Sequence, residues 1–453
     1  MLRLIHDQFV AYPTPRNLNF WWAFGAVLTL VLGLQIATGI VLAMHYVPST
    51  AHAFESVERI KRDVPSGWLI QSLHATGASM FFLAAYIHIL RSIYYGSYKS
   101  PREITWILGM LIYVTMIITA FLGYTLPWGQ MSFWGATVIT SVLGAIPLVG
   151  DGLVSWIRGG GSIDQPTLNR FYSLHYLLPF VLTGLVVLHI WALHETKQSN
   201  PEGKEIQSPA ETVPFTPNAT IKDLFITTLF LVLFAFFVFF LPHAFSEPDN
   251  SIPANPLSTP AEIVPEWYLL PFYAILRAFD FNIGPLDSKT LGVLAMFASI
   301  AVPFALPWLD AAQKRSMRYR PWARRFFLAF VVATLALGWC GAQSPTRVLW
   351  QSSPYRIEGA LHAPGGVAQT VVVSATTRDE ADTLFEQMSE RERAAGHALA
   401  RTKTSAPIVF AVTQLSVFLT LCYFAFFVLV LPLLARSETR KAAITSRQPV
   451  AAE

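Results

Sequence analysis

Residues 74–88 read HATGASMFFLAAYIH, and residues 175–189 read HYLLPFVLTGLVVLH. Each stretch begins and ends with a histidine and contains no charged residue, so both are typical of membrane-spanning helices. In an α-helix, a step of fourteen residues returns to within roughly 40° of the starting direction and rises about 21 Å. The two histidines of each stretch therefore lie on one helix face, one near each side of a hydrocarbon core about 30 Å thick.

The rest of the chain has the same apolar character. Of its 453 residues, 53% are hydrophobic and 13% are charged, about half the charged share of a soluble domain. The net charge of +4 gives no indication of nucleic-acid binding, and the two cysteines, Cys340 and Cys422, lie in apolar runs and indicate no zinc or iron–sulfur site. Eight stretches predict membrane helices: 21–46, 69–95, 104–125, 171–193, 221–241, 291–309, 326–341 and 407–434. The expected fold is an all-α integral membrane protein.

The topology determines how the four histidines pair. The second and fourth spans run in the same direction, so His74 is expected at the level of His175, and His88 at the level of His189. Two bis-histidine sites stacked across the membrane predict two haems that carry electrons, because no position stays open for a gas ligand. A buried histidine in a membrane helix can also serve another role, such as relaying protons. The matched spacing favours haem ligation.

Four glycines repeat the same spacing in the first and third spans. Gly25 and Gly39 are fourteen residues apart, and so are Gly109 and Gly123. Small residues also promote ordinary packing between membrane helices. Because the period matches that of the histidines, we expect these glycines to make room for the haems in a bundle of the first four spans.

Lysine and arginine set the orientation. Six of them lie between Lys314 and Arg325, whereas residues 242–264 contain none, so both termini are expected on the cytoplasmic side. We expect a haem-binding bundle at 1–200, further spans at 201–342 and 407–435, and a cytoplasmic tail at 436–453. Residues 343–406 have no span and predict a small extramembrane insertion, with a strand at 370–374 and a helix at 378–400. Residues 132–146 predict a short helix that lies along the positive side of the membrane, opposite the cytoplasmic side.

Several longer stretches resemble the cytochrome b family of the cytochrome bc complexes. They include LQIATGIVLAMHY at 34–46, GYTLPWGQMSFWGATVIT at 123–140, LHET at 193–196 and PEWY at 265–268. The resemblance covers roughly residues 17–344 and the last span. It implies a quinol–cytochrome c oxidoreductase subunit that oxidises quinol on the positive side and reduces quinone on the negative side, which contributes to the proton gradient. Electrons cross between the two sites through two non-covalent b-type haems.

The resemblance also assigns residues to the two quinone sites. At the quinol site it implies that Glu266 takes a proton from the quinol. Tyr124, Gly135 and Tyr268 match family positions that line the same pocket. An isolated glutamate in a loop is often only solvated, but Glu266 lies in an otherwise apolar run at 263–272.

At the opposite face, the resemblance places His194 and Asp223 at the site of quinone reduction, with Lys222 and Arg91 nearby. Taken alone, each of these residues is also compatible with an ordinary charge at a helix end. The resemblance further implies a Rieske-type iron–sulfur protein, a c-type cytochrome and a dimeric complex. Details such as HIWALHE at 189–195 look bacterial, so a bacterial inner membrane is expected.

Some residues depart from the family pattern. Gln71 stands where an arginine near a haem propionate is usual, and Lys197 and Gln198 replace small or asparagine-rich residues after HET. The resemblance does not account for residues 343–406. Three other functions remain open: a relative whose cytochrome b is split into two chains, a proton-relaying transporter, and a two-haem reductase of another fold. An absorption spectrum separates the transporter from the others.

Overall fold

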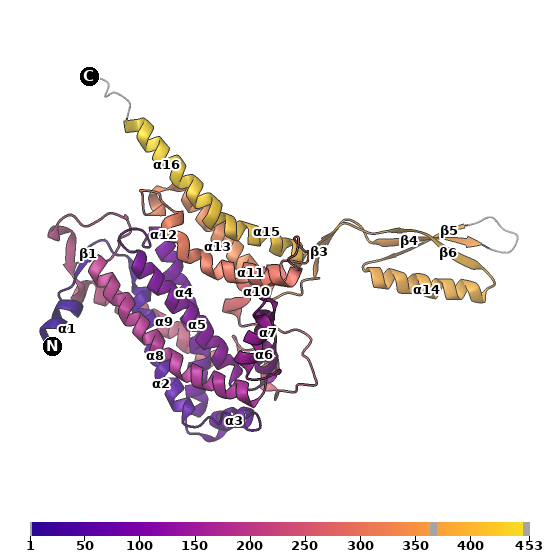
Figure 1. Cartoon of the computed structure of the whole chain (residues 1–453), viewed down its shortest axis with the longest axis horizontal. Coiled ribbons are helices and arrows are strands. Elements are labelled where there is room, and N and C mark those ends of the chain that lie inside the picture. The colour runs from indigo at the N-terminus through magenta and orange to yellow at the C-terminus, as the bar shows by residue number, and fades with distance from the viewer. Residues whose placement is uncertain (1, 363–368, 447–453) are drawn as a thin grey trace. The chain divides into compact units, whose positions relative to one another are not determined.

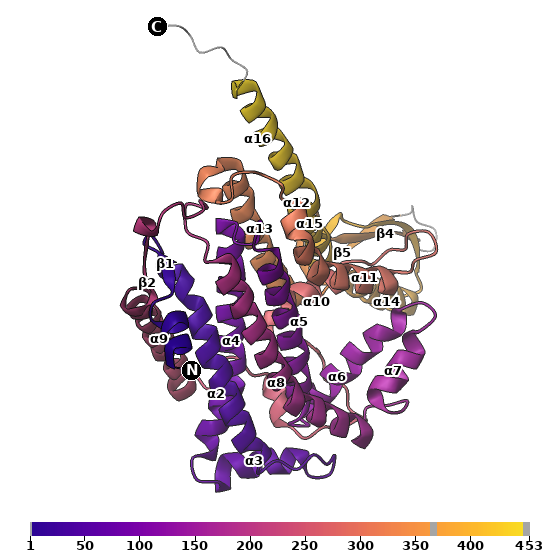
Figure 2. The same cartoon turned by 60° about the vertical axis from the view of Figure 1, so that its left-hand side comes forward.

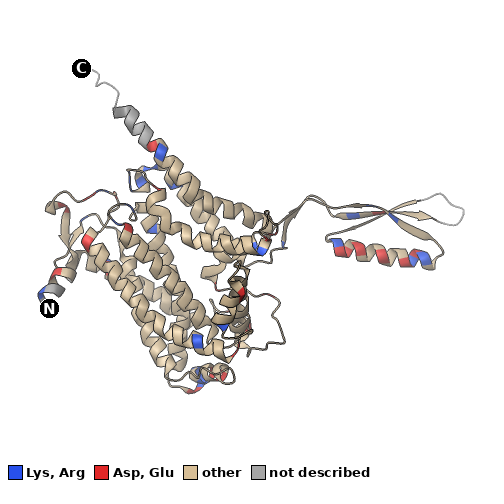
Figure 3. Cartoon of the chain, in the orientation of Figure 1, with Lys and Arg blue, Asp and Glu red and all other residues tan. Residues whose placement is uncertain are grey.

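The computed structural model describes residues 2–362 and 369–446, so the expected tail is described only as far as Ser446. Within these residues eight helical stretches are long and apolar enough to cross a membrane, which confirms the eight predicted spans. Their bounds are Phe20–Ala43, Gly67–Tyr95, Glu103–Thr125, Gln165–Thr196, Phe215–Phe240, Ser288–Leu309, Pro321–Gly341 and Val412–Glu438. Figure 3 shows that charged residues gather near the ends of these helices and are rare along them.

The first four spans pack as two helix pairs. Helix α2 (Phe24–Ala43) packs on α4 (Gly67–Tyr95), and α5 (Glu103–Thr125) packs on α8 (Gln165–Thr196) (Figures 1 and 2). Helix α8 starts at a capping box, in which the Asp164 and Thr167 side chains satisfy each other's backbone N–H groups. The cap fixes where the helix begins and therefore the depth of its two histidines. The fifth span, α9 (Phe215–Phe240), packs against α2 and α4.

Short helices lie before the first span and between the other spans. The predicted surface helix at 132–146 is α6 (Gln130–Val142) followed by a 3₁₀ turn at Leu143–Ala145. Four short helices were not predicted: α1 (Leu2–Phe9), α3 (Ala53–Asp63), α7 (Gly150–Arg158) and α10 (Leu270–Arg277). They are too short to give the run of about 20 apolar residues that predicts a span.

The remaining spans are less regular. The sixth combines α11 (Ser288–Ala301), a 3₁₀ turn (Val302–Ala305) and α12 (Leu306–Leu309), because Pro303 and Pro307 interrupt regular α-helical hydrogen bonding. The seventh, α13, begins at Pro321 and not at the predicted residue 326, so Arg324 and Arg325 lie in its first turns. Long arginine side chains at a helix end can reach the interface. The eighth comprises α15 (Val412–Ala425), a π-helical turn (Phe426–Val430) and α16 (Leu431–Ser446).

A buried cluster of charged side chains joins two loops and a helix at one end of the bundle. Asp310 accepts hydrogen bonds from Tyr98 at 2.5 Å and from both terminal nitrogens of Arg320 at 2.7 and 3.0 Å. Lys99 Nζ lies 2.9 Å from the same carboxylate, and Glu438 binds Arg320 Nε at 2.9 Å. The side chains of Asp310 and Arg320 are fully buried. Because the charges are paired, the α4–α5 loop, the α12–α13 loop and α16 are held together.

Residues Gln343–Ser416 form a separate compact unit, which contains the expected insertion. Its sheet has the order β5-β4-β6, with β4 (Tyr355–His362), β5 (Gln369–Ala375) and β6 (Ala398–Ser405) antiparallel. Helix α14 (Arg378–Ala394) packs on this sheet, and β3 (Val348–Gln351) pairs with β7 (Val409–Ala411). The prediction that the helix reaches residue 400 was wrong. Gly396 takes a φ of +81°, which stops the helix, and the chain returns as β6.

Candidate functional site

The structure brings His74 and His175 together between α4 and α8. Their ring centroids are 6.1 Å apart and their planes lie at 87°. His175 Nδ1 lies 2.8 Å from the carbonyl of Thr119, to which it donates. His74 Nδ1 lies 2.9 Å from Thr38 Oγ1, whose own hydrogen is donated to Leu34 O at 2.7 Å. Both Nδ1 atoms are therefore used, and Nε2 of each ring is the nitrogen left for a ligand.

His88 and His189 form a second pair on the same two helices. Their centroids are 6.5 Å apart, with an interplanar angle of 61°. Two metal–imidazole bonds of about 2 Å on opposite sides of one ion leave the ring centroids roughly 6 Å apart. The spacing of both pairs fits one metal ion between the rings. His88 Nδ1 is buried and has no hydrogen-bond partner in the part of the chain that the structure describes.

Each of the four spaced glycines lies beside one of the four histidines. A Cβ added to Gly123 would lie 2.4 Å from His175 Cε1, and one on Gly39 would lie 3.0 Å from His74 Cε1. The corresponding distances are 3.1 Å for Gly109 to His189 and 3.6 Å for Gly25 to His88. The glycines therefore make room for the imidazole rings themselves, and most tightly at Gly123. Gln71, the departure from the family pattern, lies half-buried on α4 one turn before His74.

Glu266 lies at the end of a loop, directly before a 3₁₀ turn at Trp267–Leu269. Burial, and then the nearby carboxylate of Glu247, raises the pKa of Glu266 to about 8. The indole of Trp267 donates to Ser79 Oγ at 3.1 Å, which ties this loop to α4. A carboxyl group with this pKa exchanges its proton near neutral pH, as a general base requires.

Tyr268, Tyr124 and Gly135 lie around this carboxyl group. The ring of Tyr268 stacks on Phe82 with centroids 3.9 Å apart and planes within 5°. Burial, followed by the charge of Glu266, raises the pKa of Tyr268 well above its usual value. The Tyr124 hydroxyl is buried without a partner among the described residues, and a Cβ on Gly135 would lie 3.8 Å from the Tyr124 ring. Glu266, Tyr268, Tyr124 and Gly135 thus lie near one another, and we call the place that they share the Glu266 pocket.

At the other end of α8, His194 contacts the N-terminal segment. Its ring stacks on Tyr12 with centroids 4.3 Å apart and planes at 18°, and its Nδ1 is hydrogen-bonded to Gln8 Oε1. Asp223 lies half-buried on α9 and makes no hydrogen bond or ion pair with the described residues. Lys222 Nζ donates to Leu18 O at 2.6 Å.

The same segment also contacts Arg91. The Arg91 guanidinium lies 5.0 Å from the ring centroid of Trp22, and its Nε is buried without a partner within the residues described. The segment from Gln8 to Trp22 is therefore the common neighbour of His194, Lys222 and Arg91. We call these three residues and Asp223 the His194 cluster. Sequence reasoning missed Gln8 and Tyr12, because a short segment that contains prolines and contacts three different helices has no periodic signal.

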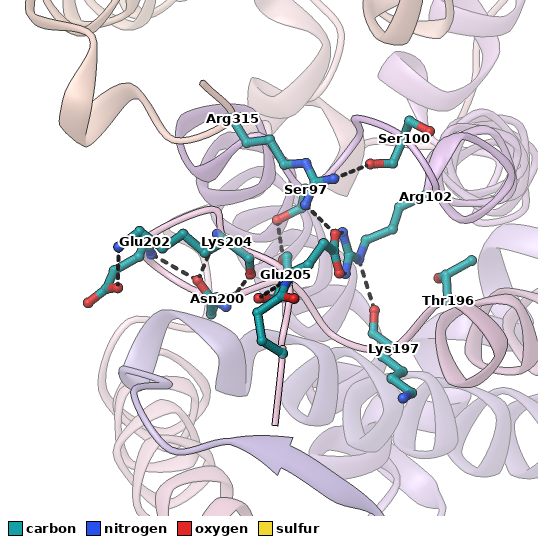
Figure 4. A network of polar contacts seen from close by, with 12 residues as sticks. Ser97, Ser100, Arg102, Thr196, Lys197, Asn200, Glu202, Lys204, Glu205 and Arg315 are labelled. Atoms are coloured by element: carbon teal, nitrogen blue, oxygen red, sulfur yellow. Dashed lines mark hydrogen bonds and ion pairs between the residues drawn. The ribbon is translucent and has the colours of Figure 1, made fainter. Parts of the chain in front are cut away.

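A second network of charges lies beside this cluster (Figure 4). Arg102 is 3% exposed and binds both carboxylate oxygens of Glu205, at 3.0 and 3.2 Å, while Arg315 binds the same carboxylate. Arg102 Nε also donates to the carbonyl of Lys197 at 2.8 Å. Lys197 has a φ of +61° and a ψ of 162°, a region that favours glycine. The network therefore holds a strained turn at the end of α8.

Comparison with known proteins gives matches along most of the chain. The family model "Cytochrome b/b6/petB" matches residues 9–197, and "Cytochrome b(C-terminal)/b6/petD" matches residues 253–355. "Cytochrome b" of Rhodospirillum rubrum is 55% identical over 342 residues, which are 76% of this chain and 83% of that protein.

Two further matches cover nearly the whole chain. "Cytochrome b/c1" of Bradyrhizobium diazoefficiens is 50% identical over 439 residues, which are 97% of this chain but 54% of that protein, so the chain spans about half of its length. A solved structure titled "Hyperthermophilic respiratory Complex III" has a chain with a TM-score of 0.78 and 32% identity, and the match covers 97% of both chains.

Proposed function

Because this chain belongs to the cytochrome b family, as a cytochrome b of the respiratory bc1 type, we propose that it oxidises quinol at the Glu266 pocket and reduces quinone at the His194 cluster. The observation that carries the proposal is the placement of two histidine pairs along α4 and α8. The two pairs would hold two metal ions, one after the other along the same two membrane helices, and Glu266 and His194 would serve toward opposite ends of that line.

Four histidines would hold two b-type haems: His74 with His175, and His88 with His189. Bound haem supplies reversible one-electron transfer. The chain contributes the spacing of the imidazoles, the Nδ1 hydrogen bonds that orient His74 and His175, and the glycines that let the rings approach.

At the Glu266 pocket, quinol loses two electrons and two protons. The electrons would leave to the iron–sulfur partner and to the haem that His74 and His175 would hold, while the Glu266 carboxylate accepts one proton and the other passes to water. A pKa near 8 makes Glu266 a stronger base than a solvated glutamate, while still letting it pass the proton on to water. The aromatic rings of Tyr268 and Phe82 form an apolar wall, and Tyr124 offers a buried hydroxyl. These groups can bind and orient a quinol ring.

At the opposite end, His194 and Asp223 would supply protons to a quinone, with Lys222 and Arg91 nearby. Lys99, Arg102, Arg315 and Arg320 gather at the same end of the bundle. The excess of lysine and arginine in the loops there supports a cytoplasmic location. We assign this end to the negative side, which puts the Glu266 pocket on the positive side, in a bacterial inner membrane with both termini cytoplasmic.

An iron–sulfur protein of the Rieske type and a c-type cytochrome are the proposed partners, in a dimeric complex. A hollow of about 260 Å³ is lined by residues of α6, α10 and α11. It is the proposed docking site for the iron–sulfur protein, next to the Glu266 pocket. Tyr273 lines this hollow and donates to the carbonyl of Ile263 at 2.9 Å, just before the PEWY segment. An electron acceptor seated there would lie close to bound quinol.

A pre-steady-state measurement tests the proposal. Quinol added to the oxidised, purified complex should reduce the haem of the His74 and His175 pair, followed by that of the His88 and His189 pair. An Asp223→Ala variant should keep this reduction and lose re-oxidation by quinone. If re-oxidation stayed normal while quinol-driven reduction failed, the two pockets would have to be exchanged.

A further inference from the structure

The N-terminal segment is built into the His194 cluster by backbone bonds as well as side chains. Strand β1 (Pro13–Pro15) pairs with β2 (Thr212–Pro214), and the N–H of Phe215, at the start of α9, donates to Tyr12 O at 2.9 Å. The hydroxyl of Thr14 adds a bond of 3.0 Å to Val213 O. Tyr12 is therefore held in one position between α8 and α9, the two helices that carry His194 and Asp223.

Gln8 determines which nitrogen of His194 is free. An amide oxygen only accepts hydrogen bonds, so Gln8 Oε1 requires a hydrogen on His194 Nδ1. Nε2 is then the nitrogen that gains and loses a proton. The stacked ring of Tyr12, 4.3 Å away, prevents the imidazole from turning toward the N-terminal segment. Together the two contacts fix both the rotamer and the tautomer of His194.

Tyr12 has a buried hydrogen-bonding group without a protein partner. The residue is 7% exposed, and its hydroxyl oxygen has no hydrogen bond to any of the residues that the structure describes. Buried polar groups of native proteins are nearly always paired with protein, ordered water or a ligand. The ring that carries this unpaired hydroxyl is stacked on His194, one of the two side chains proposed to supply protons to the quinone.

Arg102 lies close enough to Tyr12 to act on its hydroxyl. Burial raises the pKa of Tyr12 to about 12, and the guanidinium of Arg102 acts in the opposite direction. Figure 4 shows that Arg102 is itself held by Glu205 and by the carbonyl of Lys197. A cation held near a phenol favours loss of its hydrogen and so makes the hydroxyl a better hydrogen-bond donor.

We propose that Tyr12 donates a hydrogen bond to a carbonyl oxygen of the quinone at the His194 cluster, and that Gln8 is a positioning residue that fixes His194 for proton transfer. This inference rests on the proposed function of that cluster. It extends the site to a segment that precedes the first span, and the ligand class is a 1,4-quinone with two carbonyl oxygens.

The first experiment separates the hydroxyl of Tyr12 from its ring. Tyr12→Phe keeps the stack on His194 and removes only the donor. In a Glu266→Gln background, where positive-side turnover is slow, a short-chain benzoquinol added to the purified complex reduces haem through the His194 cluster. Loss of one hydrogen bond should raise the KM for this reaction about three- to tenfold with kcat little changed. Tyr319→Phe, an exposed tyrosine of the α12–α13 loop, is the matched control.

The second experiment tests the positioning role. Gln8→Leu removes the acceptor for His194 Nδ1 and should lower kcat at this site about three- to tenfold with KM little changed. Gln8→Glu keeps an oxygen acceptor and should retain most of the rate. Asp7→Asn, next to Gln8 on α1 and exposed, should behave like the unchanged complex. If α1 had a purely structural role, Gln8→Leu and Gln8→Glu should not differ in this way in kcat.

The outcomes separate the roles of Tyr12 and Gln8 from the assignment of the His194 cluster itself. If Tyr12→Phe and both Gln8 variants left KM, kcat and the EPR signal of the bound semiquinone unchanged, Tyr12 would be satisfied by water and this inference would be overturned. The proposed function would still stand if Asp223→Ala blocked the same reaction. If Asp223→Ala also had no effect, the assignment of the cluster itself would fail.

Discussion

The pH dependence of quinol oxidation should follow the ionisation of Glu266. With a pKa of about 8, about one-tenth of the Glu266 side chains are ionised at pH 7 and about half at pH 8. If the carboxylate takes the proton, kcat/KM should rise about tenfold per pH unit below pH 7 and level off above pH 9. Glu266→Gln should lower the rate about a hundredfold and flatten the profile, because general-base contributions are typically of this size.

A second substitution tests the cause of the raised pKa. Burial raises the pKa of Glu266 most, and the charge of Glu247 raises it further. Glu247→Gln should therefore move the midpoint of the pH profile to lower pH, while leaving it above 4.5, the ordinary pKa of a glutamate. The assay is steady-state quinol–cytochrome c reduction by the purified complex between pH 5.5 and 9.5. Glu262→Gln, an exposed acid of the same loop, is the control and should leave the profile in place. An unchanged profile in Glu266→Gln would refute the role of this carboxyl group as the base.

Three further outcomes are expected. Gly123→Ala should remove the haem of the His74 and His175 pair, because its Cβ would lie 2.4 Å from His175, whereas Gly25→Ala, at 3.6 Å from His88, should keep both haems in the optical spectrum; equal effects would contradict this account of the glycines. Lys197→Gly should raise the thermal midpoint of the complex by relieving about 1 kcal/mol of backbone strain, and a lowered midpoint would argue against strain. Glu390→Cys, on the exposed face of α14, should react with an impermeant thiol reagent from the positive side, with the unchanged chain as background; labelling from the cytoplasmic side alone would invert the orientation.

The spans and the histidine pairing could be predicted because both follow from simple periods. A run of about twenty apolar residues predicts a spanning helix, and a spacing of fourteen residues places two side chains on one face of it. The shared face of His74 and His88 could therefore be predicted without tertiary information. The family resemblance inferred from motifs such as PEWY is confirmed by the matches. The motifs could not show that Gly123 faces the His175 ring, since helix contacts depend on packing.

Other features could not be read from the sequence. Tyr12 and Gln8 reach His194 through a segment with no regular period, and the pairing of β1 with β2 joins residues about two hundred apart. For the insertion, the sequence predicted a strand at 370–374 and a helix that begins at residue 378. The end of that helix could not be predicted, because it depends on the positive φ of Gly396. Glycine alone does not reveal which backbone conformation it adopts.

The most direct test of the central claim is a redox-titrated optical spectrum of the purified complex and of a His88→Leu variant. The unchanged complex should show two b-type haem components with separate midpoint potentials. The variant should lose one component and keep the one held by His74 and His175, because the two pairs are independent sites on α4 and α8. A single haem in the unchanged complex, or the loss of both components in the variant, would contradict the account.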